Sequence, residues 1–362
     1  MRFNKKGNLC EILDIEYPII QAGMAGGATT VELVASVSET GALGTLGAAY
    51  MKTEDIKDAI RSIKKRTNRV FAVNLFCTSM EDDFSRMKEV QTVLNPFRVK
   101  LMVKNPDETK KTPDDFEKQF QMVIEENVPV ISTAFGILPP DKMKLAKTRG
   151  VKVVTMVTTV QEAIIAERAG ADVIVAQGSD AGGHRSTFDI KKHPNGANIG
   201  TFSLIPQVVD HVTIPVVAAG GIMDGRGMLA AMALGAEGIQ MGTQFLTSKE
   251  SGIHRLYKEA LHKSTEESTV ITKSFSGRPA RGIKNEFISQ YESSGVKPLP
   301  FPSQNTLTAD IRKGAAEQNN TDYMSLWSGQ GTRLLKADRT AECIIREVIS
   351  EMEEVLRVLN GR

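Results

Sequence analysis

The segment AQGSDAGGHRSTF, residues 176–188, holds residue types suited to binding a small anion beside a titratable side chain. Because glycine has no side chain, the backbone amides of Gly182 and Gly183 could approach an anion closely. The imidazole of His184 follows directly and would enter the mouth of a binding site. The same residues could instead form a tight turn with a solvated histidine, so both interpretations stay open at this point.

Two further glycine-rich segments have the composition of a phosphate-binding site. They are AAGGIMDGRG, residues 218–227, and QMGTQFL, residues 240–246, in which a threonine offers both a hydroxyl and an amide. Backbone amides in glycine-rich turns and at helix starts bind phosphate groups. The glycines could also merely close turns. The candidate phosphate-binding residues are Gly220, Gly221, Gln240, Met241, Gly242 and Thr243.

Two carboxamides and one segment of low bulk add to the candidate site. Asn74 interrupts the apolar run FAVNLF, and Gln177 ends another apolar run. A buried carboxamide costs free energy unless it is hydrogen-bonded, so each one either bonds a ligand or is satisfied within the core. QAGMAGG, residues 21–27, has little side-chain bulk, so a flat ring could lie against its backbone.

A scaffold must bring these clusters together, and a repeated unit in the chain indicates which fold provides that scaffold. Amphipathic helical patterns end at glycine and are followed by short β-branched runs, as in ERAGADVIVAQG, residues 167–178. Glycine ends a helix in the left-handed conformation, and an apolar run suits a strand buried on both faces. These runs predict eight strands, at 17–24, 42–47, 70–76, 128–135, 151–158, 172–177, 215–220 and 238–245.

Eight strands that alternate with helices favour a TIM (β/α)8 barrel over a doubly wound sheet. Helix starts are predicted from a cap at Thr53, a capping box formed by Thr159 and Glu162, and a cap at Asp224. Active sites of TIM barrels lie at the carboxyl ends of the strands. The glycine and amide clusters are therefore expected to meet there.

The eight strands are complete by about residue 248, which divides the chain into a barrel and a cap. We expect residues 1–248, together with 336–362, to form the barrel and residues 249–335 to form a cap over its mouth. Residues 78–115 are expected to be an insertion after the third strand that shapes the active site. Apolar residues at helical spacing within 339–360 predict a helix against the barrel wall.

Composition limits the partners and the location of the protein. The 362 residues carry a formal net charge of +2, which gives no electrostatic reason to expect nucleic acid. Three widely spaced cysteines form neither a disulfide framework nor a CxxC motif, so a reducing cytoplasm is expected. The N-terminus has no signal-peptide pattern and no apolar stretch reaches the length of a membrane span, so we expect a soluble protein.

Metal binding and cysteine chemistry are not expected either. Cys77 is interpreted as a small buried hydrophobe rather than a nucleophile. The histidines outside the glycine cluster lack the spacing of metal ligands, namely His193, His211, His254 and His262.

Taken together, the motifs resemble the FMN-dependent nitronate monooxygenases, formerly called 2-nitropropane dioxygenases. The resemblance runs from about residue 17 to residue 330 and includes SFSGRPARGI, residues 274–283, and SLWSGQG, residues 325–331. The AQGSDAGGH segment alone is shared with flavin-dependent enoyl-acyl-carrier-protein reductases and NADH:quinone reductases. The chain departs from the pattern at Gly23, where many relatives have proline, and at Ser186, where glycine is frequent. Both departures bear on substrate preference more than on flavin binding.

The resemblance implies a bound FMN and a role for each candidate residue. Asn74 and Gln177 would hydrogen-bond the flavin ring, and the backbone of Gly23 and Met24 would lie near its reactive edge. His184 would lie over the ring, where it would bind the nitro group or remove a proton from a neutral nitroalkane. The ribityl phosphate would be held by Gly182, Gly183, Gly220, Gly221, Gln240, Met241, Gly242 and Thr243.

The reaction that the resemblance implies is the oxidation of an anionic nitronate, such as propionate 3-nitronate, by O2. The products are an aldehyde and nitrite, with some nitrate, and no nicotinamide is consumed. We expect the protein to act as a monomer or a homodimer. Two alternatives stay open: an NAD(P)H-dependent flavin reductase of enoyl thioesters or quinones, and a non-catalytic barrel that binds a phosphate-bearing ligand.

Several residues of the expected cap allow two interpretations. Arg278, Arg281 and Lys284 could supply positive potential for an anionic substrate, or the two arginines could brace the cap. Aromatic residues near Gln330 could line the pocket or anchor the cap, namely Tyr323 and Trp327.

Overall fold

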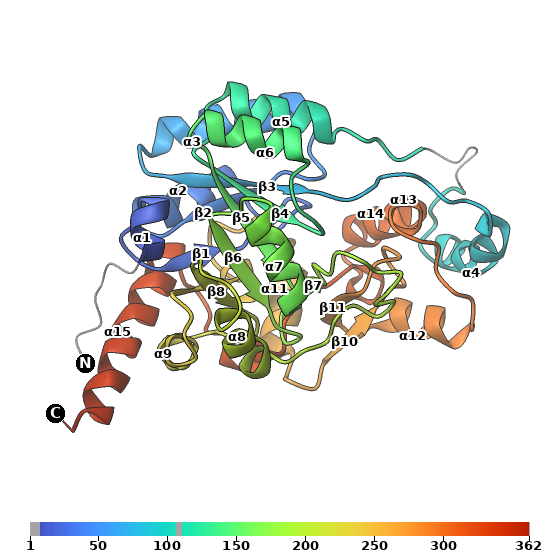
Figure 1. Ribbon diagram of the computed structural model, residues 1–362. Coiled ribbons are helices and arrows are strands. Elements are labelled where there is room, and N and C mark those ends of the chain that lie inside the picture. Colours follow the sequence, from blue (N-terminus) through green and yellow to red (C-terminus); the bar gives the residue numbers. More distant parts are fainter. Residues whose placement is uncertain (1–7, 106–110, 362) are drawn as a thin grey trace.

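The computed structural model describes residues 8–105 and 111–361, and within them eight parallel strands form a nearly closed barrel (Figure 1). The strand order is β1-β9-β8-β6-β5-β4-β3-β2, and a bridge between Ile20 and Leu43 joins the two ends of the sheet. The predicted TIM barrel is therefore confirmed. Its strands are β1 (Ile19–Gln21), β2 (Gly44–Gly47), β3 (Phe71–Phe76), β4 (Val130–Ala134), β5 (Lys152–Val157), β6 (Val173–Gln177), β8 (Val216–Ala219) and β9 (Gly238–Met241).

The repeated helix–glycine–strand unit explains how the barrel forms. Gly170 and Gly235 end their helices with φ of 99° and 95°, the left-handed conformation that other residues adopt at a cost. The apolar runs that follow them are fully buried, because helices cover their outer face and side chains fill the barrel. The chain thus turns from helix to strand where the sequence predicts.

Helices surround the barrel, and the sequence predicts the first residues of three of them. Thr159 and Asp224 cap α7 and α9 through hydrogen bonds to the amides of Glu162 and Gly227. Thr53 is the first residue of its helix rather than its cap, because Lys52 occupies that position. The helices are α1 (Asn8–Leu13), α2 (Val31–Glu39), α3 (Thr53–Arg66), α5 (Phe116–Glu125), α6 (Pro140–Thr148), α7 (Val160–Arg168), α8 (Thr201–Val209), α9 (Gly225–Ala233) and α15 (Ala341–Leu359).

The last barrel strand is shorter than its apolar pattern predicts. The strand ends at Met241, and Thr243–Leu246 forms the short helix α10, whose backbone amides at Phe245 and Leu246 bond the carbonyl of Gly242. The predicted strand over 238–245 is wrong in its second half. The apolar run could not reveal this, because a short buried helix and a short buried strand carry the same composition.

Residues after the barrel strands form a small sheet and several helices beside the barrel mouth. The sheet has the order β10-β11-β7 and is antiparallel, and β7 (Gly183–His184) comes from the loop after β6. The other elements are β10 (Thr269–Thr272), β11 (Ala280–Ile283), α11 (Arg255–Lys263), α12 (Glu286–Ser293), α13 (Ser303–Leu307), α14 (Ala309–Glu317), η1 (Thr321–Tyr323) and η2 (Gln330–Leu334).

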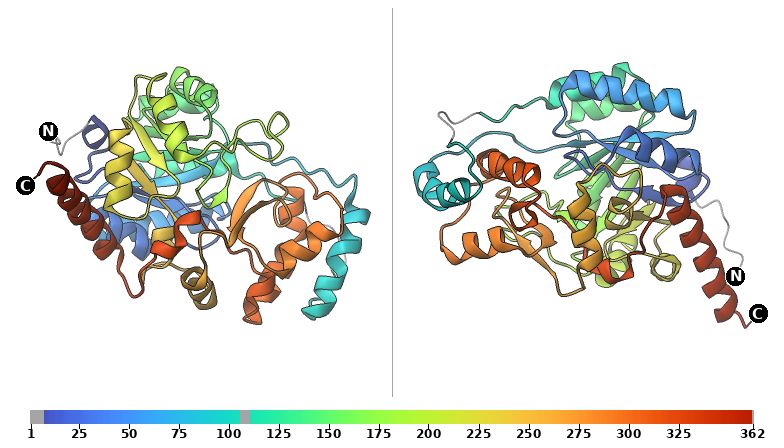
Figure 2. Two further views of the ribbon diagram at one scale, coloured as in Figure 1. Left: turned by 90° about the horizontal axis from the view of Figure 1, so that it is seen from below. Right: turned by 180° about the vertical axis from the view of Figure 1, so that it is seen from behind.

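The insertion after β3 contains α4 (Met87–Lys100), which packs on α12 and lies beside α14, far from it in sequence (Figure 2). The ring of Phe97 lies 4.9 Å from that of Phe287 and 5.8 Å from that of Tyr323. Arg98 donates from Nε to Asp310 at 2.6 Å. The insertion therefore packs against residues 249–335 and supports the helices in that segment.

The C-terminal helix α15 packs against the barrel wall, as its apolar spacing predicts. Ile344, Ile345 and Val348 are buried in the core cluster that also contains Ile19 of β1. A Cβ atom at Gly225 would overlap the backbone of Met352, so the two helices approach as closely as their main chains allow. No helix among the described residues is long and apolar enough to cross a membrane.

Candidate active site

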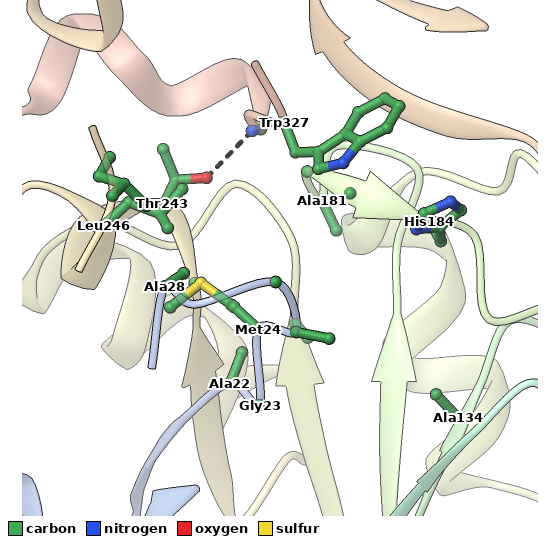
Figure 3. Close-up of a pocket in the computed structure, with 18 of the residues that line it drawn as sticks. Ala22, Gly23, Met24, Ala28, Ala134, Ala181, His184, Thr243, Leu246 and Trp327 are labelled. Carbon is green, nitrogen blue, oxygen red and sulfur yellow. Dashed lines mark hydrogen bonds between the residues drawn. The ribbon is translucent and has the colours of Figure 1, made fainter. Parts of the chain in front are cut away.

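A cavity of about 410 Å³ opens at the carboxyl ends of the barrel strands (Figure 3). We call it the strand-end pocket. All thirteen residues that the sequence singles out as site residues line it. They are Gly23, Met24, Asn74, Gln177, Gly182, Gly183, His184, Gly220, Gly221, Gln240, Met241, Gly242 and Thr243.

One end of the pocket is built from closely packed backbone. Gly182 passes so near residues 328–329 that a Cβ atom there would overlap their main chain. Gly220 has a φ of 114°, which a side chain would strain, and its carbonyl accepts a hydrogen bond from the Thr201 hydroxyl at 2.9 Å. Thr243 Oγ1 accepts from the amide of Gly329 at 3.0 Å, the bond drawn in Figure 3.

Asp180 holds in place the glycine-containing loop between β6 and β7. Its carboxylate accepts hydrogen bonds from the amide and the hydroxyl of Thr201 at 2.8 and 2.6 Å, while its carbonyl accepts from the amide of Gln330. Burial opposes ionisation of Asp180, but the bonds from Thr201 and the charge of Arg281 outweigh it and hold its pKa below the ordinary value. A charged carboxylate therefore fixes the loop between β6 and β7.

The two carboxamides are held differently. Asn74 donates from Nδ2 to Ser132 Oγ at 3.1 Å, and its side-chain oxygen Oδ1 has no hydrogen bond to the described residues. Gln177 uses both ends, since Nε2 donates to the carbonyl of His184 at 3.1 Å and Oε1 accepts from the amide of Ser186 at 2.9 Å. Asn74 thus offers an acceptor to a ligand, whereas Gln177 first of all orients the segment that carries the histidine.

The loop after β1 lies directly against β3. A Cβ atom at Gly23 would lie 2.5 Å from the Cβ atom of Asn74 and 3.0 Å from a methyl group of Thr45. Any larger residue, proline included, would move this loop. The chain therefore has Gly23 where its backbone forms the floor of the pocket beside Asn74, and the side chain of Met24 projects from that floor (Figure 3).

His184 lies between the barrel and residues of the small sheet. Its backbone pairs with Ala280 of β11, and its Nε2 lies 2.8 Å from Ser276 Oγ. The ring centroid lies 5.3 Å from that of Trp327, and the two are drawn together in Figure 3. Burial, together with the positive charges of Arg278 and Arg312, lowers the pKa of His184 to about 3. The imidazole is therefore neutral at physiological pH.

The arginines of the SGRPARG segment support the histidine loop rather than line the pocket. Arg278 donates to the carbonyls of Arg185 and Thr187 and stacks 3.9 Å from the ring centroid of Phe135. Arg281 donates from Nε to the carbonyl of Ser179 at 2.8 Å. Of the two interpretations made from the sequence, bracing is the one that these contacts favour.

The aromatic candidates separate in the structure. Trp327 lines the pocket, whereas Tyr323 is buried among Phe97, Phe287 and their neighbours and anchors the helices beside the barrel. Gln330 contributes only its backbone amide, to Asp180. Cys77 packs as a partly buried apolar residue, and burial raises the pKa of its thiol to about 12, which agrees with the absence of a nucleophilic role.

Four residues in or beside the pocket are not among the candidates from the sequence: Phe135 and Arg312 line it, and Ser276 and Phe301 approach the His184 ring. Ser276 stands directly before Gly277 in a segment already noted, so its hydroxyl could have been considered. Phe135 and Phe301 approach the His184 ring at 5.9 and 6.3 Å, yet they come from distant loops. Arg312 lies in a helix whose pattern resembles an ordinary surface helix, and nothing local indicates that it reaches the pocket.

Comparison with known proteins places this geometry in a family. A family model described as nitronate monooxygenase matches residues 6–351. The chain is 44% identical to probable nitronate monooxygenases of Staphylococcus saprophyticus, over 95% of this chain and 97% of the relative, and of Staphylococcus aureus, over 97% and 99%.

Solved structures agree with the sequence relatives. A nitroalkane oxidase from Streptomyces ansochromogenes superimposes with a TM-score of 0.90 at 33% identity, covering 98% of this chain and all of that one. FabK from Thermotoga maritima gives a TM-score of 0.78 at 31% identity, covering 98% and 99%. The chain belongs to the nitronate monooxygenase family of oxidoreductases.

Proposed function

We propose that this protein is an FMN-dependent nitronate monooxygenase that oxidises alkyl nitronates, such as propionate 3-nitronate, with O2 to an aldehyde and nitrite or nitrate. The observation that best supports this proposal is the meeting of all thirteen candidate residues on one cavity. The similarity to probable nitronate monooxygenases along nearly the whole chain supports it further. We also propose residues 1–248 with 336–362 as the barrel unit and 249–335 as the cap.

The chemistry of the residues that line the pocket supports a bound flavin mononucleotide. At one end, a Cβ atom at Gly182 would fill the backbone cradle formed with Gly329, while Thr243 Oγ1 keeps a proton to donate. The amide hydrogens at Gly221 and in the first turn of α10 suit phosphate oxygens. At the floor, the unbonded side-chain oxygen Oδ1 of Asn74 suits a ring N–H. When bound, the flavin would supply the electron-accepting chemistry, and the chain would supply placement.

The depressed pKa of His184 bears on the form of the substrate. A general base works best when its pKa lies near the working pH, and an imidazole with a pKa of about 3 is a weak base. Because the Ser276 hydroxyl donates to the carbonyl of Arg278, the proton of the neutral ring lies on Nε2, which donates to Ser276. The site is therefore better suited to a preformed nitronate than to a neutral nitroalkane, whose proton would have to be removed first.

Oxygen uptake tests the proposal directly. The flavin-loaded protein should consume O2 with propionate 3-nitronate in the absence of NADH and NADPH, and much more slowly with the neutral nitro compound. His184→Ala should abolish the slow reaction of neutral nitroalkanes and reduce that of nitronates less. A flavin-loaded preparation that consumes no O2 with any nitronate would refute the assignment.

A second candidate function is that of an NAD(P)H-dependent flavin reductase, and the similarity to FabK supports it. Such an enzyme requires reduction of its flavin by a nicotinamide. Anaerobic addition of NADH or NADPH should leave the flavin spectrum unchanged if the first proposal holds. Rapid bleaching, followed by reoxidation on adding an enoyl thioester or a quinone, would favour the second candidate.

A further inference from the structure

Phe135, the residue directly after β4, has a backbone conformation that phenylalanine seldom adopts. Its φ is 71°, in the left-handed region where a bulky side chain crowds the main chain. Five other non-glycine residues of the described chain have a positive φ, and none of them lines the strand-end pocket. Backbone strain of this kind persists where the surroundings enforce it, and it gathers at functional sites. The strained residue of the pocket is therefore a candidate for a functional role.

The left-handed turn changes the direction in which the Phe135 ring points. Side chains of β4 alternate, so that Val130 packs inside the barrel and Ile131 packs outside it in the cluster that contains residues of α3 and α5. Continued to residue 135, this alternation would send the ring outward with Ile131. Instead, the ring lines the pocket, with its centroid 5.9 Å from that of His184 and the two ring planes 78° apart. The strain thus brings an aromatic ring to the site.

Two neighbouring segments hold the backbone of this turn. The amide of Phe135 donates to Ser186 Oγ at 3.0 Å, and that hydroxyl donates to the carbonyl of Met156 at 3.1 Å. The next residue, Gly136, has no room for a side chain, because a Cβ atom there would overlap the carbonyl oxygen of Cys77. Ser186 is fully buried, so its hydrogen bonds are shielded from water. The surroundings therefore enforce the strained conformation.

The ring of Phe135 is also held in place on several sides. The guanidinium of Arg278, which is itself buried, lies 3.9 Å from the ring centroid. The ring centroids of Phe76 and Phe301 lie 4.4 and 6.0 Å away. Groups packed at this density leave little space into which a ring can move. The Phe135 ring is therefore a rigid wall of the pocket beside His184.

We propose that Phe135 is a specificity-determining residue, whose ring limits the length of the carbon chain that a nitronate can carry beside His184. This inference rests on the proposed function and concerns the shape of the same site. The proposed reaction takes place beside the imidazole, so the chain on the nitronate carbon lies against the walls nearest to it. A longer chain would have to displace the ring together with its supports, which is costly in a packed environment.

Nitronates of increasing chain length test the inference. We would measure kcat/KM for ethyl nitronate, butyl-1-nitronate and hexyl-1-nitronate in the flavin-loaded wild type and in Phe135→Gly. Because glycine adopts a φ of 71° freely, this variant removes the ring without adding backbone strain. The ratio of the hexyl to the ethyl value should rise about tenfold, since methylene groups excluded by the ring are then accommodated.

Two supporting variants and a control accompany this change. Ser186→Ala keeps the ring but removes the hydroxyl that accepts from its amide, so it should raise the same ratio by a smaller factor, about threefold. Phe135→Leu keeps an apolar side chain under Arg278 and serves if the glycine variant unfolds, with a rise of similar size. Met102→Gly is the control, because Met102 also has a positive φ but is exposed and far from the pocket lining, and it should leave the ratio unchanged.

Binding without turnover provides a second readout. Linear carboxylates are planar anions, as nitronates are, so acetate and hexanoate can be titrated into the flavin-loaded protein and followed by flavin absorbance. Hexanoate should bind about tenfold more tightly to Phe135→Gly than to the wild type, and acetate equally to both. If the wild type oxidises no nitronate, the proposed function fails, whereas this titration still reports on the wall.

Several results would contradict the inference. Equal changes of kcat/KM for all chain lengths would show that Phe135 acts on His184 rather than on the substrate chain. Loss of FMN from Phe135→Gly would place the ring against the cofactor. An unchanged hexyl-to-ethyl ratio and an unchanged affinity for hexanoate, in variants that keep their flavin, would make the ring a packing residue only.

Discussion

Single atoms decide what the strand-end pocket can hold. At Gly182 the absence of a Cβ atom allows two stretches of main chain, 180–183 and 328–331, to lie in contact. At His184 one hydroxyl, that of Ser276, fixes a ring nitrogen. These features concern the positions of atoms rather than the composition of the pocket, and each predicts the effect of a substitution.

Gly182→Ala should weaken flavin binding more than it weakens the fold. The added methyl group would overlap the backbone at Gly329 and force the two loops apart, so we expect at least a tenfold rise in the Kd for FMN. Flavin fluorescence quenching measures it. Gly200→Ala is the control, because a Cβ atom there meets nothing within 4 Å, and it should bind FMN normally. Equal affinity in both variants would contradict the cradle.

The low pKa of His184 predicts a loss of stability in mild acid. The folded protein keeps this imidazole neutral down to about pH 3, whereas the unfolded chain takes up the proton below about pH 6.5. Stability linked to His184 is therefore complete above pH 6.5 and is lost as the pH falls toward 3.

Urea unfolding at pH 7 and pH 5 measures this linkage. His184→Gln, which cannot titrate, should lose about 1–2 kcal/mol less stability than the wild type between these two pH values. The pH profile of nitronate oxidation should also lack an inflection from His184 between pH 5 and 8. An inflection near 6.5 that disappears in the Gln variant would show that the imidazole keeps its ordinary pKa.

At the scale of elements, the helices beside the barrel depend on a partner far away in sequence. Arg98 of α4 is fully buried and donates to Asp310, to the carbonyl of Leu307 and to neighbours in its own helix. Residues 98 and 310 are 212 positions apart. The insertion after β3 therefore holds α13 and α14 in place, and α14 carries Arg312.

Arg98→Met should destabilise this helix pair selectively. Arg98 is fully buried and Asp310 is partly exposed, so loss of the pair and of the other hydrogen bonds of Arg98 costs about 2 kcal/mol. We expect faster hydrogen exchange in α13 and α14, with exchange in β4 to β6 unchanged. Arg61→Met, which removes an exposed ion pair with Glu126, is the control and should change neither. Uniform changes across the barrel would show that α4 is not a local support.

The elements also show what a single sequence can predict. Local signals were sufficient to predict the barrel, because each glycine-ended helix and each apolar run has its own conformational preference. They were also sufficient to predict the site, because the glycine and amide clusters directly follow those runs. They failed where structure depends on distant contacts. Arg312 reaches the pocket from α14, far from the barrel strands in sequence, and the two-residue strand β7 exists only because β11 pairs with it.

For the molecule as a whole, the two ends of the described chain both secure the barrel. Near the start, the amide of Leu9 donates to Glu237 before β9, and near the end α15 packs across α2 and α9 (Figure 1). The barrel is nearly closed by one bridge between Ile20 and Leu43. Helices from the termini therefore cover the region where the sheet closes with the fewest bonds.

Gly225→Ala tests this role of α15. The methyl group would overlap the backbone at Met352 and displace the helix, at a cost of about 1–3 kcal/mol. Thermal unfolding should show a lower Tm with normal FMN affinity, since the pocket is elsewhere. Arg226→Ala, an exposed neighbour, should leave Tm within error. A Gly225→Ala variant that lost flavin at unchanged Tm would contradict this division.

His184 is held from two sides, by the barrel and by the residues that pair with β7. Its backbone pairs with Ala280 of β11 and its ring is bonded to Ser276 in the turn before β11, while Gln177 of β6 donates to its carbonyl. A shift of either support would move the imidazole relative to the glycines of the pocket. The reach of the imidazole toward a ligand is thus set jointly by β6 and β11.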